Sequence, residues 1–218
     1  MTAALALLRA RPQHLVRHPA RTRERILTAA LREFSDKGFA GARVDRIARR
    51  ARVNKRMLYH YFGNKESLFR EILARKVRER AAWSVTAPDD AAESLVFWFD
   101  TVCRDRDWVR LMEWEALGRA EGGVNGDAER RAAFQMGVGQ VRERQGRGLL
   151  RADVDPGHLL LAMIALTTFP AAFPQFTRLL TGLRPTDRAF AARHTAFLRR
   201  LADGLRPVRQ RHVAGARR

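Results

Sequence analysis

The stretch that decides the fold is RVDRIARRARVNKRMLYHYFGNK, residues 43–65. In its first half, apolar side chains recur at the spacing of one helix face, at Val44, Ile47, Ala48 and Ala51. A turn at residues 52–54 follows, and Asn54 suits the position before a new helix because its side-chain oxygen accepts a backbone N–H. The pattern predicts two short helices joined by a tight turn.

The second predicted helix separates an inner face from an outer one. Leu58, Tyr61 and Phe62 form the inner face. The outward side chains are Lys55, Arg56, Met57, Tyr59 and His60. Small residues on the first helix let the two cross closely and leave the second free to enter a DNA major groove, which is the geometry of a helix-turn-helix. An ordinary αα-hairpin on a basic surface is the alternative.

The flanks of this stretch resemble the tetracycline-repressor (TetR) family of transcriptional regulators. Upstream, RILTAALREFSDKG at residues 25–38 is similar to that family's first helix, with Gly38 where a helix end favours a left-handed residue. Downstream, LYHYFGNKESLF at residues 58–69 closely matches the family signature LYxxFxxKexLf. The resemblance covers residues 23–73 and implies a three-helix DNA-binding head.

Three residues depart from the family pattern. The turn carries Arg52 where the family usually has glycine, so we expect Arg52 at positive φ or a slightly opened turn. Arg43 replaces a usual Thr or Ser, and Arg56 replaces a small residue at the tip of the recognition helix. Added arginines are good phosphate and guanine ligands. The last two departures, Arg43 and Arg56, therefore bear on which DNA sequence is read rather than on DNA binding itself.

The resemblance, carried over residue by residue, implies a set of DNA contacts. Its members are Arg43, Arg46, Asn54, Lys55, Arg56, Met57, Tyr59, His60 and Lys65. Lys55 and Arg56 are the candidates for base edges, and Met57 is a candidate for a thymine methyl group. The remaining cations, Tyr59 and His60 are phosphate candidates, with Lys65 at a helix N-terminus that attracts phosphate. Solvated surface is the alternative for each.

Positive charge is concentrated on the same part of the chain. The formal net charge is +19, and residues 1–81 hold 21 of the 42 Lys and Arg but only 7 of the 23 Asp and Glu. Counterion release at phosphates favours such a distribution. An anionic membrane or RNA would select the same charge, but neither explains the turn and its flanks.

Other classes of protein find little support in the sequence. The single cysteine, Cys103, excludes an intramolecular disulfide and fits a reducing cytoplasm. The sequence has no run of about 18 apolar residues that would span a membrane. It has no GxSxG, P-loop, GxGxxG, HExxH or CxxC motif, and its six histidines show no metal-ligand clustering. We expect no enzyme activity, cofactor or metal, and a cytoplasmic, nucleoid-associated protein.

The hydrophobic content of 46% predicts a folded chain, and its periodicity predicts an all-α one. We expect a basic lead at residues 1–21, a helix-turn-helix domain at 22–68, a helical ligand-binding and dimerisation domain at 69–206, and a basic tail at 207–218. The lead is interpreted as a disordered tail or as an arm on DNA. The most apolar segment, residues 156–180, is expected to break or kink at Pro170 and Pro174.

For the second domain, the resemblance implies a homodimer through the last two long helices and a small-molecule pocket enclosed by the middle ones. Pocket candidates are Phe97, Trp98, Trp108, Met112, Trp114, Phe134, Met136, Met163 and Phe169. Filling the bundle core is the alternative for each. Glu113 and Glu115 flank Trp114, and an acid beside aromatic rings suits a cationic ligand, although a solvated helix face explains both acids as well.

The sequence therefore predicts a sequence-specific DNA-binding transcriptional regulator, with repression of a palindromic operator and release by a small-molecule inducer. Two heads on a two-fold axis would read half-sites about 34–36 Å apart. The alternative is a non-specific nucleic-acid-binding or packaging protein with no ligand response. It would bind unrelated DNA equally, whereas a specific regulator prefers one site by about 10³ or more.

Overall fold

The computed structural model describes residues 19–118 and 127–207, and this part of the chain contains helices and no strand. The helices are α1 (Pro19–Gly41), α2 (Val44–Arg50), α3 (Lys55–Phe62), α4 (Lys65–Thr86), α5 (Ala91–Arg104), α6 (Arg106–Gly118), α7 (Asp127–Gly146), α8 (Pro156–Ala172), α9 (Pro174–Thr181), α10 (Arg188–Ala202) and a short 3₁₀ turn (Asp203–Leu205). The all-α prediction is confirmed. Nearly all of the predicted lead and tail lies outside the described residues.

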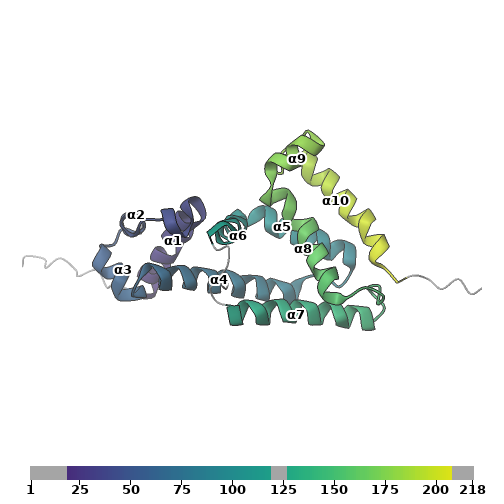
Figure 1. Cartoon of the computed structure of the whole chain (residues 1–218), viewed down its shortest axis with the longest axis horizontal. Helices are drawn as coiled ribbons and strands as arrows, with labels where there is room; N and C mark the ends of the chain where they lie inside the picture. Colours follow the sequence, from purple (N-terminus) through teal and green to yellow (C-terminus); the bar gives the residue numbers. More distant parts are fainter. Residues whose placement is uncertain (1–18, 119–126, 208–218) are drawn as a thin grey trace, which may run out of the picture.

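One end of the molecule, which we call the head, consists of α1, α2, α3 and the first turns of α4 (Figure 1). Its core is apolar: Ile26, Ala30 and Phe34 of α1 are fully buried against Ile47 of α2 and Leu58 of α3. Helices α2 and α3 have only seven and eight residues. Isolated helices of that length are unstable in water, so the core that α1 and α4 supply keeps them folded.

Local hydrogen bonds fix where the head's short helices begin. Asn54 accepts a hydrogen bond from the Met57 backbone N–H at 2.7 Å, as predicted for an N-cap. Asn64 caps α4 in the same way, accepting from Ser67 at 2.7 Å. Between α3 and α4, Gly63 adopts φ 74° and ψ −66°, a γ-turn conformation that strains any residue with a side chain. The chain therefore reverses sharply and brings the start of α4 beside α3.

The rest of α4 and helices α5 to α10 form what we call the body. In it α5 packs against α8 and α10, while α7 runs beside α4 and α8 (Figure 1). Its core includes Leu95 and Phe99 of α5, Leu159 of α8, and Phe190 and Leu198 of α10. The long helix α4 thus belongs to the head at one end and to the body at the other.

The apolar segment breaks at one of the two predicted prolines. Helix α8 continues through Pro170, and α9 departs after Phe173 at an angle of 88°. A proline at this position cannot bond the carbonyl four residues earlier, that of Leu166. The ring of His194 on α10 supplies a substitute, with Nε2 3.1 Å from the Leu166 oxygen. Helix α8 continues past Pro170 to Ala172, and the break falls at Pro174.

Helices α8, α9 and α10 expose an unusually large number of apolar side chains. This α8–α10 apolar face consists of Leu161, Ile164, Phe169, Phe173, Phe176, Leu179, Leu180, Phe197 and Leu201. Within the described part of the chain, no single helix is long and apolar enough to cross a membrane, and α8 and α9 pass that test only when taken together across their bend. Three of these residues, Phe169, Phe173 and Phe176, are in mutual ring contact, with centroids 4.9–6.4 Å apart.

The head and the body meet where α6 packs against α1. The indole of Trp114 covers Gly38, at which a Cβ would lie 2.8 Å from the ring, and its Nε1 donates to the Ser35 carbonyl at 3.1 Å. The Ser35 hydroxyl in turn donates to Asp107 at 2.8 Å. Gly38 kinks α1 with φ 67° and ψ 175°, a combination essentially restricted to glycine. Leu111 of α6 is fully buried in the head's core.

Candidate functional site

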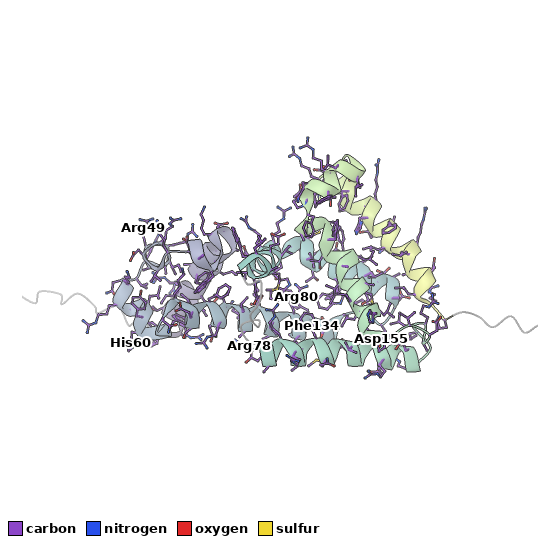
Figure 2. All side chains as sticks on the ribbon, in the orientation of Figure 1. Arg49, His60, Arg78, Arg80, Phe134 and Asp155 are labelled. Atoms are coloured by element: carbon purple, nitrogen blue, oxygen red, sulfur yellow. The ribbon has the colours of Figure 1, made fainter. Side chains whose placement is uncertain are left out.

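The outer face of α3 carries the side chains that the sequence predicted for DNA. Lys55, Arg56, Tyr59 and His60 are exposed, whereas Met57 is half-buried. Figure 2 shows His60 at the end of the head. On the inner face Leu58 and Phe62 are buried, and Tyr61 is half-buried against the head's core. The structure therefore brings the α3 candidates together on one surface.

Lys55 is held by an acid of the same head. Its Nζ lies 3.1 Å from Asp45 Oδ1, and both side chains are exposed. The hydrogen bond with Asp45 raises the pKa of Lys55 above its ordinary value. Lys55 is therefore charged at neutral pH, and the contact with Asp45 occupies one of its three N–H donors.

Other predicted DNA contacts also have partners inside the head. The buried Glu33 lies 3.6 Å from Arg46 Nη1 and accepts from the Arg43 backbone N–H at 3.2 Å, while the Arg43 side chain is exposed. Lys65 Nζ lies 3.5 Å from the Ala40 carbonyl oxygen and 4.7 Å from the centre of the Phe39 ring. Arg46 and Lys65 therefore stabilise the head in addition to any role on DNA.

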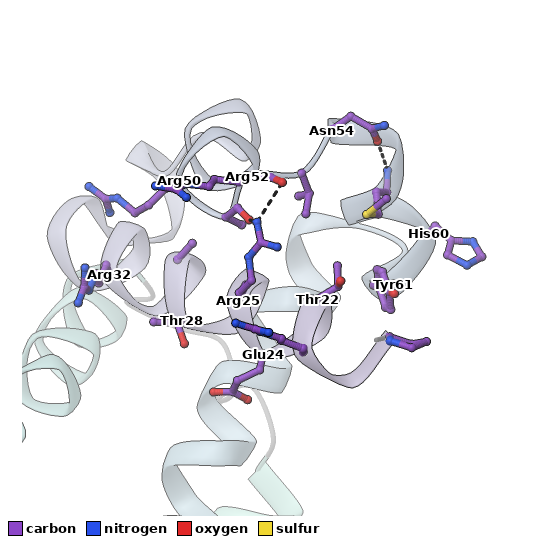
Figure 3. A pocket seen from close by; sticks show the side chains of 16 residues that line it. Thr22, Glu24, Arg25, Thr28, Arg32, Arg50, Arg52, Asn54, His60 and Tyr61 are labelled. Atoms are coloured by element: carbon purple, nitrogen blue, oxygen red, sulfur yellow. Dashed lines mark hydrogen bonds between the residues drawn. The ribbon is translucent and has the colours of Figure 1, made fainter. Parts of the chain in front are cut away.

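A basic groove beside α3 was missed in the sequence. It is lined by Arg21, Arg25 and Arg32 of α1 and by Arg50 and Arg52 at the turn, with His60 at its outer edge (Figure 3). Arg25 donates to the Ala51 carbonyl and, at 3.1 Å, to that of Arg52. Arg52 adopts φ 53°, the positive value expected for it. The spacing of 21, 25 and 32 places these arginines on one helix face, a signal that was readable from the sequence.

A second hollow, which we call the cavity, lies in the body among α4, α5, α6, α7 and α8. Its volume is about 340 Å³, at the small end of the range of about 300–1,000 Å³ for ligand pockets. The predicted residues that line it are Trp98, Trp108, Met112, Phe134 and Met163. The others lie elsewhere: Phe97 packs edge-on to Trp98, Trp114 forms the joint with α1, and Met136 and Phe169 are exposed.

The cavity also has polar lining residues that the sequence analysis did not identify. They include Arg80 of α4, Ser94 of α5, and Arg130 and Arg144 of α7. Figure 2 shows Arg80 and Phe134 in the body. Arg130 Nη1 lies 2.6 Å from Glu115, and Arg144 Nε lies 3.3 Å from Asp89. Glu115, interpreted as a partner for a cationic ligand or as a solvated residue, is thus largely buried and already neutralised.

Sequence comparisons identify the family of the chain. The profile described as "Bacterial regulatory proteins, tetR family" matches residues 26–72. The profile described as "Tetracyclin repressor-like, C-terminal domain" matches residues 90–203. The chain therefore belongs to the TetR family of DNA-binding transcriptional regulators, as the resemblance implied.

Individual relatives agree with this assignment. The HTH-type transcriptional repressor SCO4008 of Streptomyces coelicolor is 34% identical over 166 residues, covering 76% of this chain and 86% of that protein. The HTH-type transcriptional repressor NicS of Pseudomonas putida is 32% identical over 162 residues, covering 68% and 75%. These relatives are transcriptional regulators rather than enzymes.

Solved structures show the same architecture. The transcriptional regulator SCO4942 of Streptomyces coelicolor superposes with a TM-score of 0.70 at 28% identity, covering 83% of this chain and 97% of that one. A regulator from Saccharomonospora viridis, solved in complex with choline, gives a TM-score of 0.61 at 20% identity, covering 84% and 96%. The second likeness concerns the fold alone.

Proposed function

We propose that the chain is a repressor that binds a palindromic operator as a homodimer and leaves it when a small molecule occupies the cavity. The observation that carries this proposal is the exposed face of α3, where Lys55, Arg56, Tyr59 and His60 stand side by side at the end of the head. Such a helix fits a major groove, and the protein would act on the bacterial nucleoid.

Each predicted DNA contact has a role in this proposal. Lys55 and Arg56 read base edges, with Arg56 bonding guanine O6 and N7, and Met57 touches a thymine methyl group. Tyr59, His60 and Lys65 hold phosphates, together with the side chains of Arg43 and Arg46. Asn54 fixes the start of α3 through its bond to the Met57 backbone, so it sets the depth at which the helix enters the groove.

The α8–α10 apolar face supports a dimer. Leu161 of α8 is 63% exposed and Phe197 of α10 is 48% exposed. Burying apolar surface stabilises an association by about 25 cal/mol per Å², before the cost of association is subtracted. A two-fold axis through this face would place two heads on one side of a duplex and match a palindrome.

Helix α6 offers a route between the cavity and the head. Trp108 and Met112 line the cavity, whereas Leu111 is buried in the head's core and Trp114 covers Gly38. One rigid helix therefore contacts both places. A ligand that favours a different position of α6 would lower DNA affinity, and DNA would lower ligand affinity by the same factor.

Selection of bound genomic fragments by the full-length chain at physiological salt tests the proposal. We expect one palindromic site to be preferred by about 10³ over unrelated DNA. Enrichment of no sequence would instead favour the packaging protein. For the dimer, Phe197→Glu should convert the protein to monomers in sedimentation and weaken binding to the full palindrome. Val85→Glu, an equally drastic change at a 76% exposed residue of α4, is the matched control and should leave the dimer intact.

A further inference from the structure

The charged side chains that line the cavity are all positive. Among the described residues that line it are Arg80, Arg130 and Arg144, and none of those residues is an Asp or Glu. Arg130 and Arg144 are matched by acids that lie outside the lining, Glu115 and Asp89. Arg80 is matched less closely, because its Nη1 lies 4.0 Å from Asp105 Oδ2, an ion pair without a hydrogen bond.

Arg80 has a buried nitrogen without a hydrogen bond. Its Nη1 is inaccessible to solvent and unpartnered, and the Asp105 Oδ2 atom stands 4.0 Å away, beyond hydrogen-bonding distance. The other oxygen of Asp105 is held by Lys76 at 2.9 Å. Burial lowers the pKa of the Arg80 guanidinium, and Asp105 opposes this only in part. A guanidinium nevertheless stays protonated in proteins, so a positive charge remains in the wall of the cavity.

Aromatic rings fix the position of that charge. The guanidinium carbon of Arg80 lies 5.4 Å from the centre of the Trp98 ring and 5.2 Å from that of Trp108. Arg130 lies over the same Trp108 ring at 5.9 Å. The rings hold Arg80 by cation–π attraction but offer its N–H groups no lone pair in the ring plane. Nη1 therefore keeps an N–H donor that no atom of the described chain accepts.

Ser94 provides a second, independent donor. It lines the cavity, is only 2% exposed, and its Oγ has no hydrogen-bond partner. It precedes Trp98 by one turn of α5, on the same face of the helix. Buried hydroxyl groups in proteins are almost always hydrogen-bonded, because leaving one unpaired is costly. The cavity thus contains a cationic donor and a neutral donor, both suited to an acceptor with negative charge.

We propose that the cavity binds a small organic carboxylate, which accepts hydrogen bonds from Arg80 Nη1 and Ser94 Oγ. Its apolar part packs against Phe134, Leu160 and Met163, which line the same cavity. A carboxylate has the lone pairs and charge that a guanidinium matches best. This inference rests on the proposed function in one respect: it assigns the chemical class of the molecule that releases DNA.

Calorimetry on the full-length chain without DNA tests the ligand class. The probes are benzoate, indole-3-acetate, naphthalene-2-carboxylate and octanoate, each compared with its own neutral carboxamide. We expect at least one carboxylate to bind about 10- to 100-fold more tightly than its amide, the range typical of a charged hydrogen bond. The proposal is overturned if none of the acids binds, or if every amide binds as well as its acid.

Variants then assign the binding to the two donors. Arg80→Met and Ser94→Ala should each weaken the preferred carboxylate about tenfold or more while leaving its amide unchanged. Arg131→Met, which removes an exposed arginine of α7 that does not line the cavity, is the matched control. Because Ser94→Ala keeps the shape of the site, it stays informative if Arg80→Met fails to fold. Carboxylate affinity that is unchanged in Ser94→Ala and in a folded Arg80 variant would sink the assignment.

The experiments distinguish an error in the carboxylate site from an error in the proposed function. If a carboxylate binds through Arg80 and also dissociates the selected operator fragment, both stand. If it binds through Arg80 without affecting DNA, the carboxylate site stands and the proposed inducible release is wrong. If an operator is selected but no probe acid binds, the regulator stands and the ligand class is wrong.

Discussion

The head and the body use arginine in opposite ways. The head keeps its arginines at the surface, around α3 and in the groove beside α1, over a core of apolar side chains. The body instead places Arg80, Arg130 and Arg144 in the wall of a cavity, where Arg80 and Arg130 lie over the Trp108 ring and Arg130 pairs with the largely buried Glu115. Exposed arginines suit a long polyanion such as DNA, which releases its counterions on binding. Enclosed arginines suit a single small anion, because a buried charge needs a partner. Under the two proposals, the same residue type serves two kinds of recognition in one chain.

The largest effect is expected where the two regions meet. Gly38→Ala places a Cβ 2.8 Å from the Trp114 ring and forces a side chain into a glycine-only conformation. We expect the free energy of unfolding to fall by about 2–4 kcal/mol, from strain and overpacking together. Urea denaturation followed by circular dichroism measures it.

Gly63→Ala is the matched control for this change. Gly63 also has a positive φ, 74°, but a Cβ there would meet nothing within 4 Å. The free energy of unfolding of Gly63→Ala should therefore fall only by the cost of backbone strain, about 1–3 kcal/mol. If DNA affinity falls in folded Gly38→Ala but not in Gly63→Ala, the α1–α6 contact positions the head. Equal losses of stability in the two variants would contradict a steric role for Trp114.

The next effect separates base reading from phosphate contact within the head. Arg56→Ala should weaken binding to the selected operator by about 10- to 100-fold and relax its sequence preference. Lys65→Ala should weaken all sequences by a similar factor and flatten the salt dependence by about one counterion. Fluorescence anisotropy at several salt concentrations distinguishes the two. Unchanged affinity in both variants would undo the assignment of α3 as the reading helix.

A smaller effect tests whether the acid in the head restrains Lys55. Asp45→Asn removes the carboxylate that lies 3.1 Å from Lys55 Nζ. We expect DNA binding to tighten by about twofold to fivefold, with a steeper salt dependence, because exposed ion pairs are weak. Asp36→Asn controls for the general loss of a negative charge, since Asp36 faces Arg110 of α6 instead. An equal gain in both variants would mean that the Asp45–Lys55 pair has no particular role.

The parts of the molecule that were predictable from the sequence depend on local contacts. The cap at Asn54 and the buried Leu58 and Phe62 follow from neighbours within a few residues, whereas the positive φ of Arg52 was expected from the family resemblance. The cavity does not, because Arg80, Ser94 and Arg130 come from three different helices. No periodicity links them, and only the packing of those helices brings them together.

The aromatic residues of the body show the same limit. Trp108 and Trp114 lie on one helix and have similar chemistry, yet Trp108 lines the cavity and Trp114 covers Gly38. The two residues lie on different faces of α6. Which of these faces points to the head depends on how α1 packs against α6. Pro170 is a further example, since the carbonyl that it leaves without an N–H donor, that of Leu166, is contacted by His194 of α10. The sequence alone therefore identifies the aromatic residues of the body, but it does not show which residues each of them contacts.

A similarly small effect, on stability, is expected at the turn of the head. Arg52 holds φ 53°, a left-handed conformation that a side chain disfavours, while Arg25 bonds the carbonyls on either side. Replacement by Gly removes the Cβ and the charge, whereas Ala removes the charge alone. Arg52→Gly should therefore be more stable than Arg52→Ala by about 1 kcal/mol in thermal unfolding. Equal stability of the two variants would show that the hydrogen bonds from Arg25, rather than residue 52, determine the shape of the turn. An arginine would then be tolerated at positive φ because the surrounding contacts hold the backbone in that conformation.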